Sequence, residues 1–307
     1  MFGDYNLIVA QGILAGMERQ ILGRWGMVGA LLLLLAALVF DEQGGQRAGF
    51  FSTPSPYLEV TFLDVGQGDA ILIETPDGVQ ALIDGGPDGT VLRELARELS
   101  WGDRTLDLVI GTHPDKDHIG GLIDVLARYK VASILTTENT GETTTASQYQ
   151  KALTTETNIV HMARAGQVYT LGASTTLTIL SPARNPSMLE SNTASIVAKL
   201  SFGEIDFMLT GDAPSGIEDY LSVTYGDTLQ SEVLKLGHHG SKTSTGQLFL
   251  ETVKPQYAVV SAGADNRYGH PNGEVVERVT AAGIAIRSTI EGKRVKFVTD
   301  GKTVWEE

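Results

Sequence analysis

The side chains best suited to chemistry lie in one short stretch, THPDKDHIGG, over residues 112–121. It contains His113, Asp115, Asp117 and His118. Imidazole and carboxylate groups are the usual protein ligands of zinc, manganese and iron(II). In an extended loop, alternate side chains point to one side, so positions 113, 115 and 117 are expected to face one site. The adjacent Asp117 and His118 can then turn to a second ion.

Further residues of ligand type lie where other short strands are expected to end. Five of the six histidines fall into three such clusters, which argues against reading the His113 loop as an ordinary solvated turn. The strand-end residues outside that loop are Asp84 in LIDGG, Asp212 in MLTGD, His238 and His239 in LKLGHHGS, and His270 in YGHP. Because α/β folds place their sites at the carboxyl edge of the strands, we expect these residues to converge.

Three of these histidine and aspartate positions allow more than one interpretation. Asp212 follows a glycine, as turn-forming aspartates often do, yet a carboxylate there also suits a bridge between two metal ions. His238 and His239 cannot both face one way in an extended segment, so one is expected in the site and the other against the core or a supporting partner. His161 has no other ligand type near it and is interpreted as an ordinary surface or core residue.

The elements that must position these residues follow from the apolar patterning. Residues 58–63, 70–74 and 79–83 predict an antiparallel meander, 90–99 a helix, and 108–111 a buried strand that leads into the His113 loop. A second half of similar style follows, with strands predicted before Asp212 and His238. Strands dominate both halves and helices interleave late in each, which favours two sheets packed face to face with helices outside.

The composition limits which molecules the chain can be expected to bind. The net charge of −14 makes a broad electrostatic footprint for nucleic acid or anionic lipid unfavourable. It does not exclude a metal-centred site that handles a phosphodiester locally, because bound cations can dominate the field there. The chain has no cysteine, which excludes disulfides and thiolate ligands.

The beginning of the chain predicts a membrane anchor at residues 25–40, after an N-terminal segment at 1–24. This run is uncharged and Leu-rich, and its 16 residues fall slightly short of a usual spanning helix. The competing interpretations are a signal peptide, for which the cleavage site that follows is a poor one, and a buried core helix, for which the run lacks the expected polar face. Arg19 and Arg24 precede the run, which predicts that the N-terminus lies in the cytoplasm. The chain would then cross the cell membrane once, and its bulk would be extracytoplasmic. A linker at 41–56 then leads to a globular domain at 57–307.

Several motifs together resemble the metallo-β-lactamase superfamily, and within it the extracytoplasmic domain of the bacterial competence channel ComEC and its stand-alone relatives. The matching stretches occur in the family's order and are FLDVGQGDAILIE (62–74), LIDGG (82–86), THPDKDHIGG (112–121), NTAS (192–195), LTGD (209–212), LKLGHHGSKTS (234–244) and NRYGHP (266–271). This resemblance implies an α/β fold, the αββα four-layer sandwich, preceded here by one hydrophobic helix.

The departures from the superfamily pattern HxHxDH are informative. Asp115 replaces the second histidine, as is usual in the ComEC branch, and Asn192 stands in the stretch where a middle histidine is expected. One metal position is therefore poor in ligands, or rich in oxygen and suited to a harder ion such as Mn²⁺. The multispan channel of ComEC is also absent from this sequence.

Two-metal chemistry then implies a set of roles, with two divalent ions, zinc or manganese, as cofactors. His113 and Asp115 would bind one ion, Asp117 and His118 the other, and Asp212 would bridge them. His239 or His270 would complete a shell or protonate the leaving oxygen. Residues expected to support the site or the substrate are Asp69, Asp84, Asn192, His238, Ser241 and Lys242.

The predicted function is hydrolysis by metal-activated water, with DNA or another phosphodiester as substrate at the membrane surface. No obligate protein partner is inferred. The acidic charge leaves a second hypothesis open, the hydrolysis of a small ester, lactone or amide. The missing middle histidine leaves a third, a domain of the same fold that binds or scaffolds without turnover.

Overall fold

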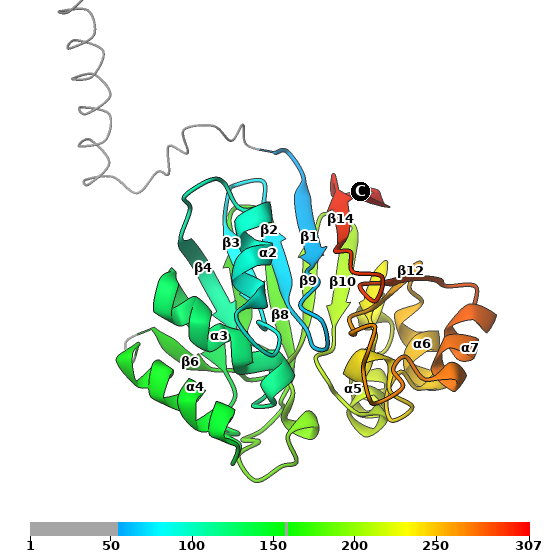
Figure 1. Cartoon of the computed structure of the whole chain (residues 1–307). Helices are drawn as coiled ribbons and strands as arrows, with labels where there is room; N and C mark the ends of the chain where they lie inside the picture. Colours follow the sequence, from blue (N-terminus) through cyan, green and yellow to red (C-terminus); the bar gives the residue numbers. More distant parts are fainter. Residues whose placement is uncertain (1–54, 157–158) are drawn as a thin grey trace, which may run out of the picture. The chain divides into compact units, whose positions relative to one another are not determined.

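Two β-sheets form the centre of the protein, seen in a computed structural model that describes residues 55–156 and 159–307 (Figure 1). The first sheet has, in spatial order, strands β15 (Val304–Glu306), β14 (Val295–Thr299), β1 (Leu58–Phe62), β2 (Ile71–Glu74), β3 (Gln80–Ile83), β4 (Thr105–Ile110), β5 (Lys130–Thr136) and β6 (Val160–Met162). The second has β13 (Ala285–Ser288), β12 (Tyr257–Val260), β11 (Val233–Lys235), β10 (Ile205–Leu209), β9 (Val197–Phe202), β8 (Thr175–Ser181) and β7 (Val168–Leu171).

Helices cover the outer face of each sheet. The first sheet carries α2 (Thr90–Glu98), α3 (Lys116–Arg128) and α4 (Thr144–Thr155), and the second carries α5 (Ser215–Tyr225), α6 (Gln247–Val253) and α7 (Gly273–Ala281). Short 3₁₀ turns lie at η2 (Asn192–Ala194), η3 (Gly226–Leu229) and η4 (Gly237–Gly240). The predicted four-layer αββα sandwich is confirmed.

Three apolar cores hold these layers together, and strand alternation explains them. In β3, Ala81 and Ile83 face the second sheet, whereas Leu82 between them faces the helices. The same period of two divides the other strands between an inter-sheet core and an outer one. Burying each such Leu or Ile side chain contributes roughly 1.5–3 kcal/mol, so the register of each strand is strongly specified.

The connections in the first sheet place the chemistry at one edge. Strands β1, β2 and β3 pair antiparallel, as the predicted meander requires, and β3, β4 and β5 then run parallel. In the second sheet β10, β11 and β12 are parallel. The loops that leave β3, β4, β10 and β11 therefore emerge at the carboxyl ends of parallel strands, where α/β folds bind ligands.

Two glycines bring the start of α3 against the loop after β3. A Cβ on Gly121 would lie 2.0 Å from the backbone oxygen of Gly85, and one on Gly120 would lie 2.2 Å from that of Pro87. The Gly121 N–H donates to Gly86 O at 2.9 Å, so the close approach is also bonded. Only glycine fits such contacts. The HIGG sequence thus fixes α3, and with it His118, against the neighbouring loop.

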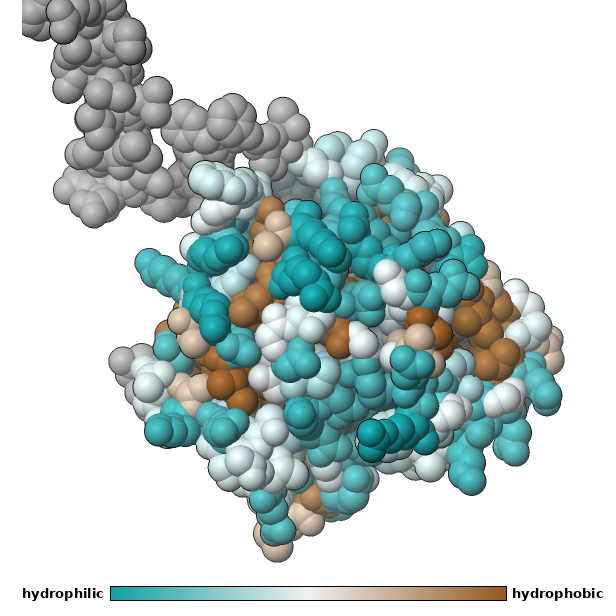
Figure 2. All heavy atoms as spheres, viewed as in Figure 1, coloured by the Kyte–Doolittle hydropathy of each residue, from teal (hydrophilic) through white to brown (hydrophobic). Residues whose placement is uncertain are grey.

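The predicted anchor at 25–40 and nearly all of the predicted linker at 41–56 lie outside the described residues. Among the helices of residues 55–156 and 159–307, none is long and apolar enough to cross a membrane. The face of the protein in Figure 2 is largely hydrophilic, with apolar side chains in several smaller patches.

Candidate metal centre

Loops and helix starts from both sheets bring the predicted ligands together. His113 and Asp115 follow β4, and Asp117 and His118 occupy the first turn of α3, for which Asp115 is the N-cap residue. Asp212 follows β10 in the second sheet. The extended spacing expected from the sequence therefore ends at Asp115, because a helix begins at Lys116. The helix turns Asp117 and His118 toward the same side as Asp212.

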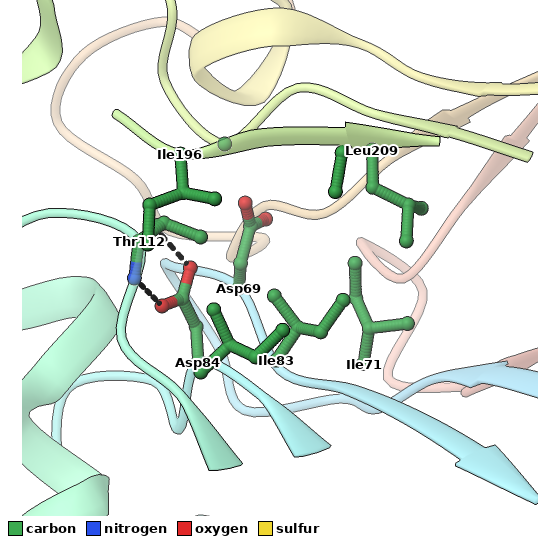
Figure 3. Close-up of a pocket in the computed structure, with 10 residues that line it drawn as sticks. Asp69, Ile71, Ile83, Asp84, Thr112, Ile196 and Leu209 are labelled. Atoms are coloured by element: carbon green, nitrogen blue, oxygen red, sulfur yellow. Dashed lines mark hydrogen bonds between the residues drawn. The ribbon is translucent and has the colours of Figure 1, made fainter. Parts of the chain in front are cut away.

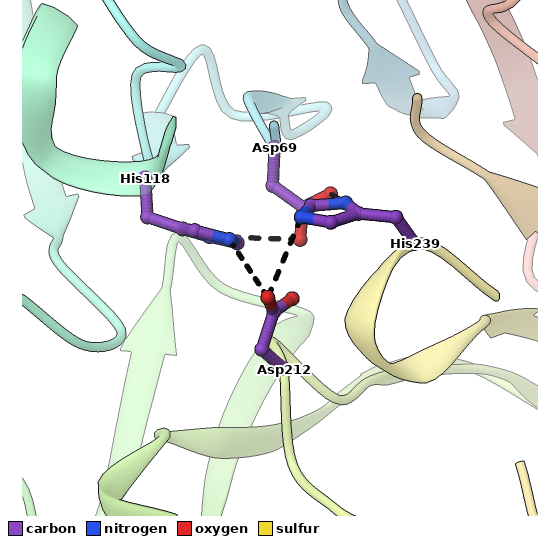
Figure 4. Close-up of side chains that lie close together, drawn as sticks. All are labelled: Asp69, His118, Asp212 and His239. Carbon is purple, nitrogen blue, oxygen red and sulfur yellow. Dashed lines mark ion pairs between the residues drawn. The ribbon is translucent and has the colours of Figure 1, made fainter. Parts of the chain in front are cut away.

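One tight position forms where Asp212 meets two imidazoles and a second carboxylate. Asp212 Oδ2 lies 3.2 Å from His118 Nε2 and 3.4 Å from His239 Nε2, and His239 Nε2 lies 3.4 Å from Asp117 Oδ2. Four ligands arranged tetrahedrally at zinc distances would lie about 3.3–3.4 Å from one another. We call this group, Asp117, His118, Asp212 and His239, position A. Figure 4 shows His118 and His239 directed at Asp212.

A hydrogen bond on the far side of each ring fixes which nitrogen faces the site. His239 Nδ1 lies 2.8 Å from the carbonyl oxygen of Ser261, which only accepts, so Nδ1 carries the hydrogen. His118 Nδ1 lies 2.8 Å from Asp84 Oδ2. Within the described residues, the buried Nε2 atoms of both rings make no hydrogen bond. A ring anchored through Nδ1 with a free Nε2 is the arrangement of metal-binding histidines.

Asp84 fixes a third ring through Thr112. The Thr112 hydroxyl donates to Asp84 Oδ2 at 2.7 Å, so its oxygen is left to accept from His113 Nδ1, 3.0 Å away. His113 Nε2 is buried and makes no hydrogen bond to the part of the chain that the structure describes. Asp84 itself has φ of +59°, a backbone strain typical of functional sites. One carboxylate thus sets the orientation of both His113 and His118.

A looser group of possible ligands meets the same Asp212 oxygen, Oδ2. His113 Nε2 is 3.8 Å from Asp212 Oδ2 and 3.8 Å from Asp115 Oδ2, and Asp115 accepts a hydrogen bond from Ser191 Oγ at 2.7 Å. Nearby, the Asn192 amide nitrogen lies 3.4 Å from His238 Nδ1. We call the group His113, Asp115 and Asp212 position B, with Asn192 beside His238. Asn192 Oδ1 is buried without a partner among the described residues, and an amide oxygen suits a harder ion.

The His238–His239 pair departs from the extended geometry expected of it. Both residues have left-handed backbone angles, with φ of +48° and +56°, within η4. The turn aims both rings at Asp212: His238 Nε2 lies 3.8 Å from Asp212 Oδ2, and its side chain is still 29% exposed. The expected extended geometry is therefore wrong, and His238 lies near Asp212 while its Nδ1 faces Asn192. His238, His239 and Asp84 are three of the five non-glycine residues with positive φ in the described chain.

A buried lysine, not singled out by the sequence, stands behind the site. Lys235 Nζ lies 2.5 Å from Asp69 Oδ2 and 3.5 Å from Asp212 Oδ1, and it donates to Gly211 O at 2.8 Å. Asp69 also belongs to a compact set of possible ligands with His118, Asp212 and His239. Because its carboxylate already pairs with an ammonium, we assign Asp69 to Lys235 rather than to a metal ion. In the sequence LKLGHH, the only sign that Lys235 is buried and paired is its place in an apolar strand.

The remaining predicted residues, Ser241, Lys242 and His270, differ in exposure. Ser241 is buried and its Oγ lies 3.0 Å from Thr243 Oγ1, which in turn lies 3.4 Å from His238 Nδ1. Lys242 is exposed. His270 is half-buried, and its ring lies 5.5 Å from that of His238. His270 is therefore at the mouth of the site, whereas His239 lies inside position A.

The electrostatics of the site favour a cation. Burial lowers the pKa of His118 and His239, but the carboxylate of Asp212 outweighs it and holds both well above their usual value. Burial raises the pKa of Asp212, but the two imidazoles outweigh this and hold it well below its usual range. Burial lowers the pKa of His113 to about 3, so that ring is neutral and ready to bind a metal. Divalent ions would displace the protons from the other two rings.

A small cavity lies beneath the site, between the two sheets. Figure 3 shows Asp69 and Asp84 at its edge, with Ile71, Ile83 and Leu209 facing it. Its volume is about 10 Å³, the lower limit of what one water needs. A substrate must therefore reach Asp212 from the outside. On that side a groove of about 390 Å³ runs past Asp115, lined also by residues 139–143 and 187–189.

The four-layer fold, the donor set around Asp212 and the sequence motifs agree with one protein class. Residues 63–264 match the family model of the metallo-beta-lactamase superfamily. The chain belongs to this superfamily, whose members are typically metal-dependent hydrolases.

Within the superfamily, the chain is similar to bacterial competence proteins. It is 29% identical over 259 residues to ComE operon protein 3 of Bacillus subtilis (strain 168), covering 78% of this chain and 33% of that protein. It is 31% identical over 248 residues to competence protein ComA of Neisseria gonorrhoeae, covering 79% and 33%. The chain thus spans about a third of the length of these relatives.

Solved structures agree on the fold. CmlA, a diiron β-hydroxylase from Streptomyces venezuelae, matches with a TM-score of 0.53 at 14% sequence identity, covering 84% of this chain and 55% of CmlA. At this identity the likeness shows a shared architecture. The chemistry of this chain follows from its own residues.

Proposed function

We propose that the chain is a metal-dependent phosphodiesterase that cleaves DNA. The observation that carries the metal-dependent part is the set of three buried imidazoles, His113, His118 and His239, whose Nε2 atoms surround Asp212. Two lines of support favour a phosphodiester: the similarity to competence proteins and the ComEC-type motifs. Position A would hold one divalent ion and position B a second, zinc or manganese, with Asp212 shared between them.

The bound ions would lower the pKa of a water and polarise the scissile group, which is the chemistry that two-metal sites supply. The protein's own residues do the rest. Asp84 and Ser261 hold the imidazoles in the orientation that presents Nε2. Lys235 pairs with Asp212 Oδ1, which leaves Oδ2 to face the imidazoles. His270, at the mouth, is placed to exchange a proton with the leaving oxygen.

The pKa of His270 bears on this last role. Burial lowers it, and the neighbouring His238 lowers it further, so the ring is neutral at pH 7. A neutral imidazole acts as a proton relay between a leaving group and water rather than as a stored acid. His239 cannot take this role because it lies buried within position A.

A small neutral ester, lactone or amide is the second candidate substrate. The groove past Asp115 favours it, since the described residues that line this groove include two carboxylates, Asp115 and Glu142, and no basic side chain. A polyanion would be repelled there unless bound ions reverse the local field. The third candidate is a non-catalytic role for the whole domain. Its basis is that Asn192 stands where the superfamily has its middle histidine.

The experiment that separates these candidates is a substrate panel. The full-length chain is stripped with chelator, reloaded with Mn²⁺ or Zn²⁺, and offered a labelled single-stranded oligonucleotide, a small phosphodiester, and a set of esters and lactones. We expect metal-dependent cleavage of both phosphodiesters. Turnover of esters alone would establish the second candidate, and metal binding without turnover of any substrate would establish the third.

A further inference from the structure

A row of aromatic rings leads from the metal centre to the surface. His238 lies beside Asp212, the ring of His270 lies 5.5 Å from that of His238, and the ring of Tyr268 stacks on His270 at 5.7 Å with an angle of 17° between the planes. Two ring-to-ring contacts therefore connect the Tyr268 side chain to the place where a scissile group would lie. The Tyr268 side chain remains 70% exposed.

Single exposed aromatic residues are common on protein surfaces and need no function. Tyr268 differs because its loop is built and tied to the site. The Asn266 side chain accepts from the His270 N–H at 2.9 Å and donates to the carbonyls of Gly263 and His270, each at 2.7 Å. The Asn272 N–H donates to Gly240 O in the η4 turn at 2.8 Å. These bonds hold the backbone on both sides of Tyr268, and the stack on His270 orients its ring.

The charge of the protein makes such a ring useful. Nucleic-acid binding usually draws its affinity from lysines and arginines that displace counterions from phosphates. This chain has 23 basic and 37 acidic residues, and its groove past Asp115 is acidic. Stacking of a base on an aromatic side chain does not depend on charge, and every base offers a flat face. A base in a duplex is paired and stacked, whereas a base in a single strand is unpaired and costs less to unstack.

We propose that Tyr268 is a stacking platform for a nucleobase adjacent to the scissile phosphodiester, and that the site therefore selects single-stranded nucleic acid. This inference rests on the proposed phosphodiesterase function. It names Tyr268 as a substrate-binding residue and the flat face of a base as the group it binds. Binding through this contact should depend only weakly on salt, in contrast with binding through a basic groove.

Steady-state kinetics of the full-length, metal-loaded chain test it with matched variants. The substrates are a single-stranded oligonucleotide and the same oligonucleotide with abasic sites around the cleaved bond. For Tyr268→Ala we expect KM on the intact strand to rise by about 5- to 150-fold, the range that loss of one stacked base gives, with a smaller change in kcat. Tyr268→Phe keeps the ring and should retain the wild-type KM. Trp101→Ala removes a fully exposed ring in the loop before β4 and should change nothing.

The abasic strand separates stacking from a structural role. We expect wild type and Tyr268→Ala to cleave it with similar KM, because no base is left to stack. An equal KM for wild type and Tyr268→Ala on the intact strand overturns the inference, as does the same loss on intact and abasic strands. If wild type cleaves no phosphodiester at all, the proposed function fails and this inference fails with it. If wild type cleaves and only the Tyr268 result differs, the proposed function stands.

Discussion

Asp84 Oδ2 accepts a hydrogen bond from His118 Nδ1 at 2.8 Å, and this contact decides which nitrogen of His118 faces Asp212. The same oxygen accepts from the Thr112 hydroxyl, which orients His113. The two proposed metal positions therefore share Asp84 as a buried hydrogen-bond partner and Asp212 as a common carboxylate. Such supports are as much a part of a metal site as its ligands.

The first prediction is that Asp84→Asn weakens metal binding while the protein stays folded. The substitution keeps the side chain's size but weakens the acceptor that both His118 and Thr112 use. We expect affinity for Mn²⁺ or Zn²⁺ to fall by about 10- to 100-fold, the usual effect of removing such a support. Isothermal titration calorimetry on chelator-treated protein measures it. Asp124→Asn, at an exposed pair with Arg128, is the control. Equal affinity in the Asp84 variant and wild type would contradict the assigned role.

The second prediction concerns the buried pair of Lys235 and Asp69. Removing either partner leaves the other charged and buried, which costs on the order of 3–5 kcal/mol of unfolding free energy. We expect Lys235→Met and Asp69→Asn each to lower the free energy of unfolding strongly. The double variant should lose much less unfolding free energy than the two single variants added together. Urea denaturation of all four proteins gives the coupling energy.

The exposed pair of Lys254 and Asp227, whose Nζ and Oδ1 are 3.4 Å apart, supplies the comparison. Its coupling should lie within about 1 kcal/mol, as for other surface ion pairs. Were the buried pair to show no more coupling than this exposed one, Lys235 would not be the partner that stabilises Asp69.

The third prediction is a pH effect from Glu218, a buried carboxylate outside the proposed ligand set. Burial raises the pKa of Glu218 to about 7, although the carboxylate accepts from the Thr245 and Gly246 N–H groups at the start of α6. Between the ordinary pKa of a glutamate side chain and about pH 7, the folded state binds the Glu218 carboxyl proton more tightly than the unfolded state does. The contribution of Glu218 to stability therefore falls as pH rises through that window, by up to about 3 kcal/mol.

Glu218→Gln removes this titration. The difference in unfolding free energy between the variant and wild type should shift in favour of the variant between pH 5 and pH 8. Urea denaturation at a series of pH values measures the shift. A difference that is constant with pH, or one that moves in favour of wild type, would show that Glu218 does not titrate in this way.

The sequence predicts the layers well because they depend on local pattern. Alternating or continuous apolar runs mark the strands, and the HPDKDH motif follows a buried strand directly. The ion pair between Lys235 and Asp69 could not be predicted, since it joins strand β11 of the second sheet to the loop between β1 and β2 of the first, and no short-range signal marks a lysine for burial. The paired left-handed angles of His238 and His239 were also missed, because histidine rarely adopts them without tertiary support.

The measurement that tests the central claim most directly is cleavage of a labelled single-stranded oligonucleotide by wild type and by Asp117→Asn across a titration with Mn²⁺. Asp117 Oδ2 lies 3.4 Å from His239 Nε2 in position A, and the substitution keeps its size while removing a negative charge. We predict that wild-type turnover appears with added metal and reaches a plateau. We predict that the variant stays folded and is slower by on the order of 10²-fold or more, as for other strongly electrostatic catalytic groups. A wild type without turnover in any divalent metal, or a variant as active as wild type, would contradict the account.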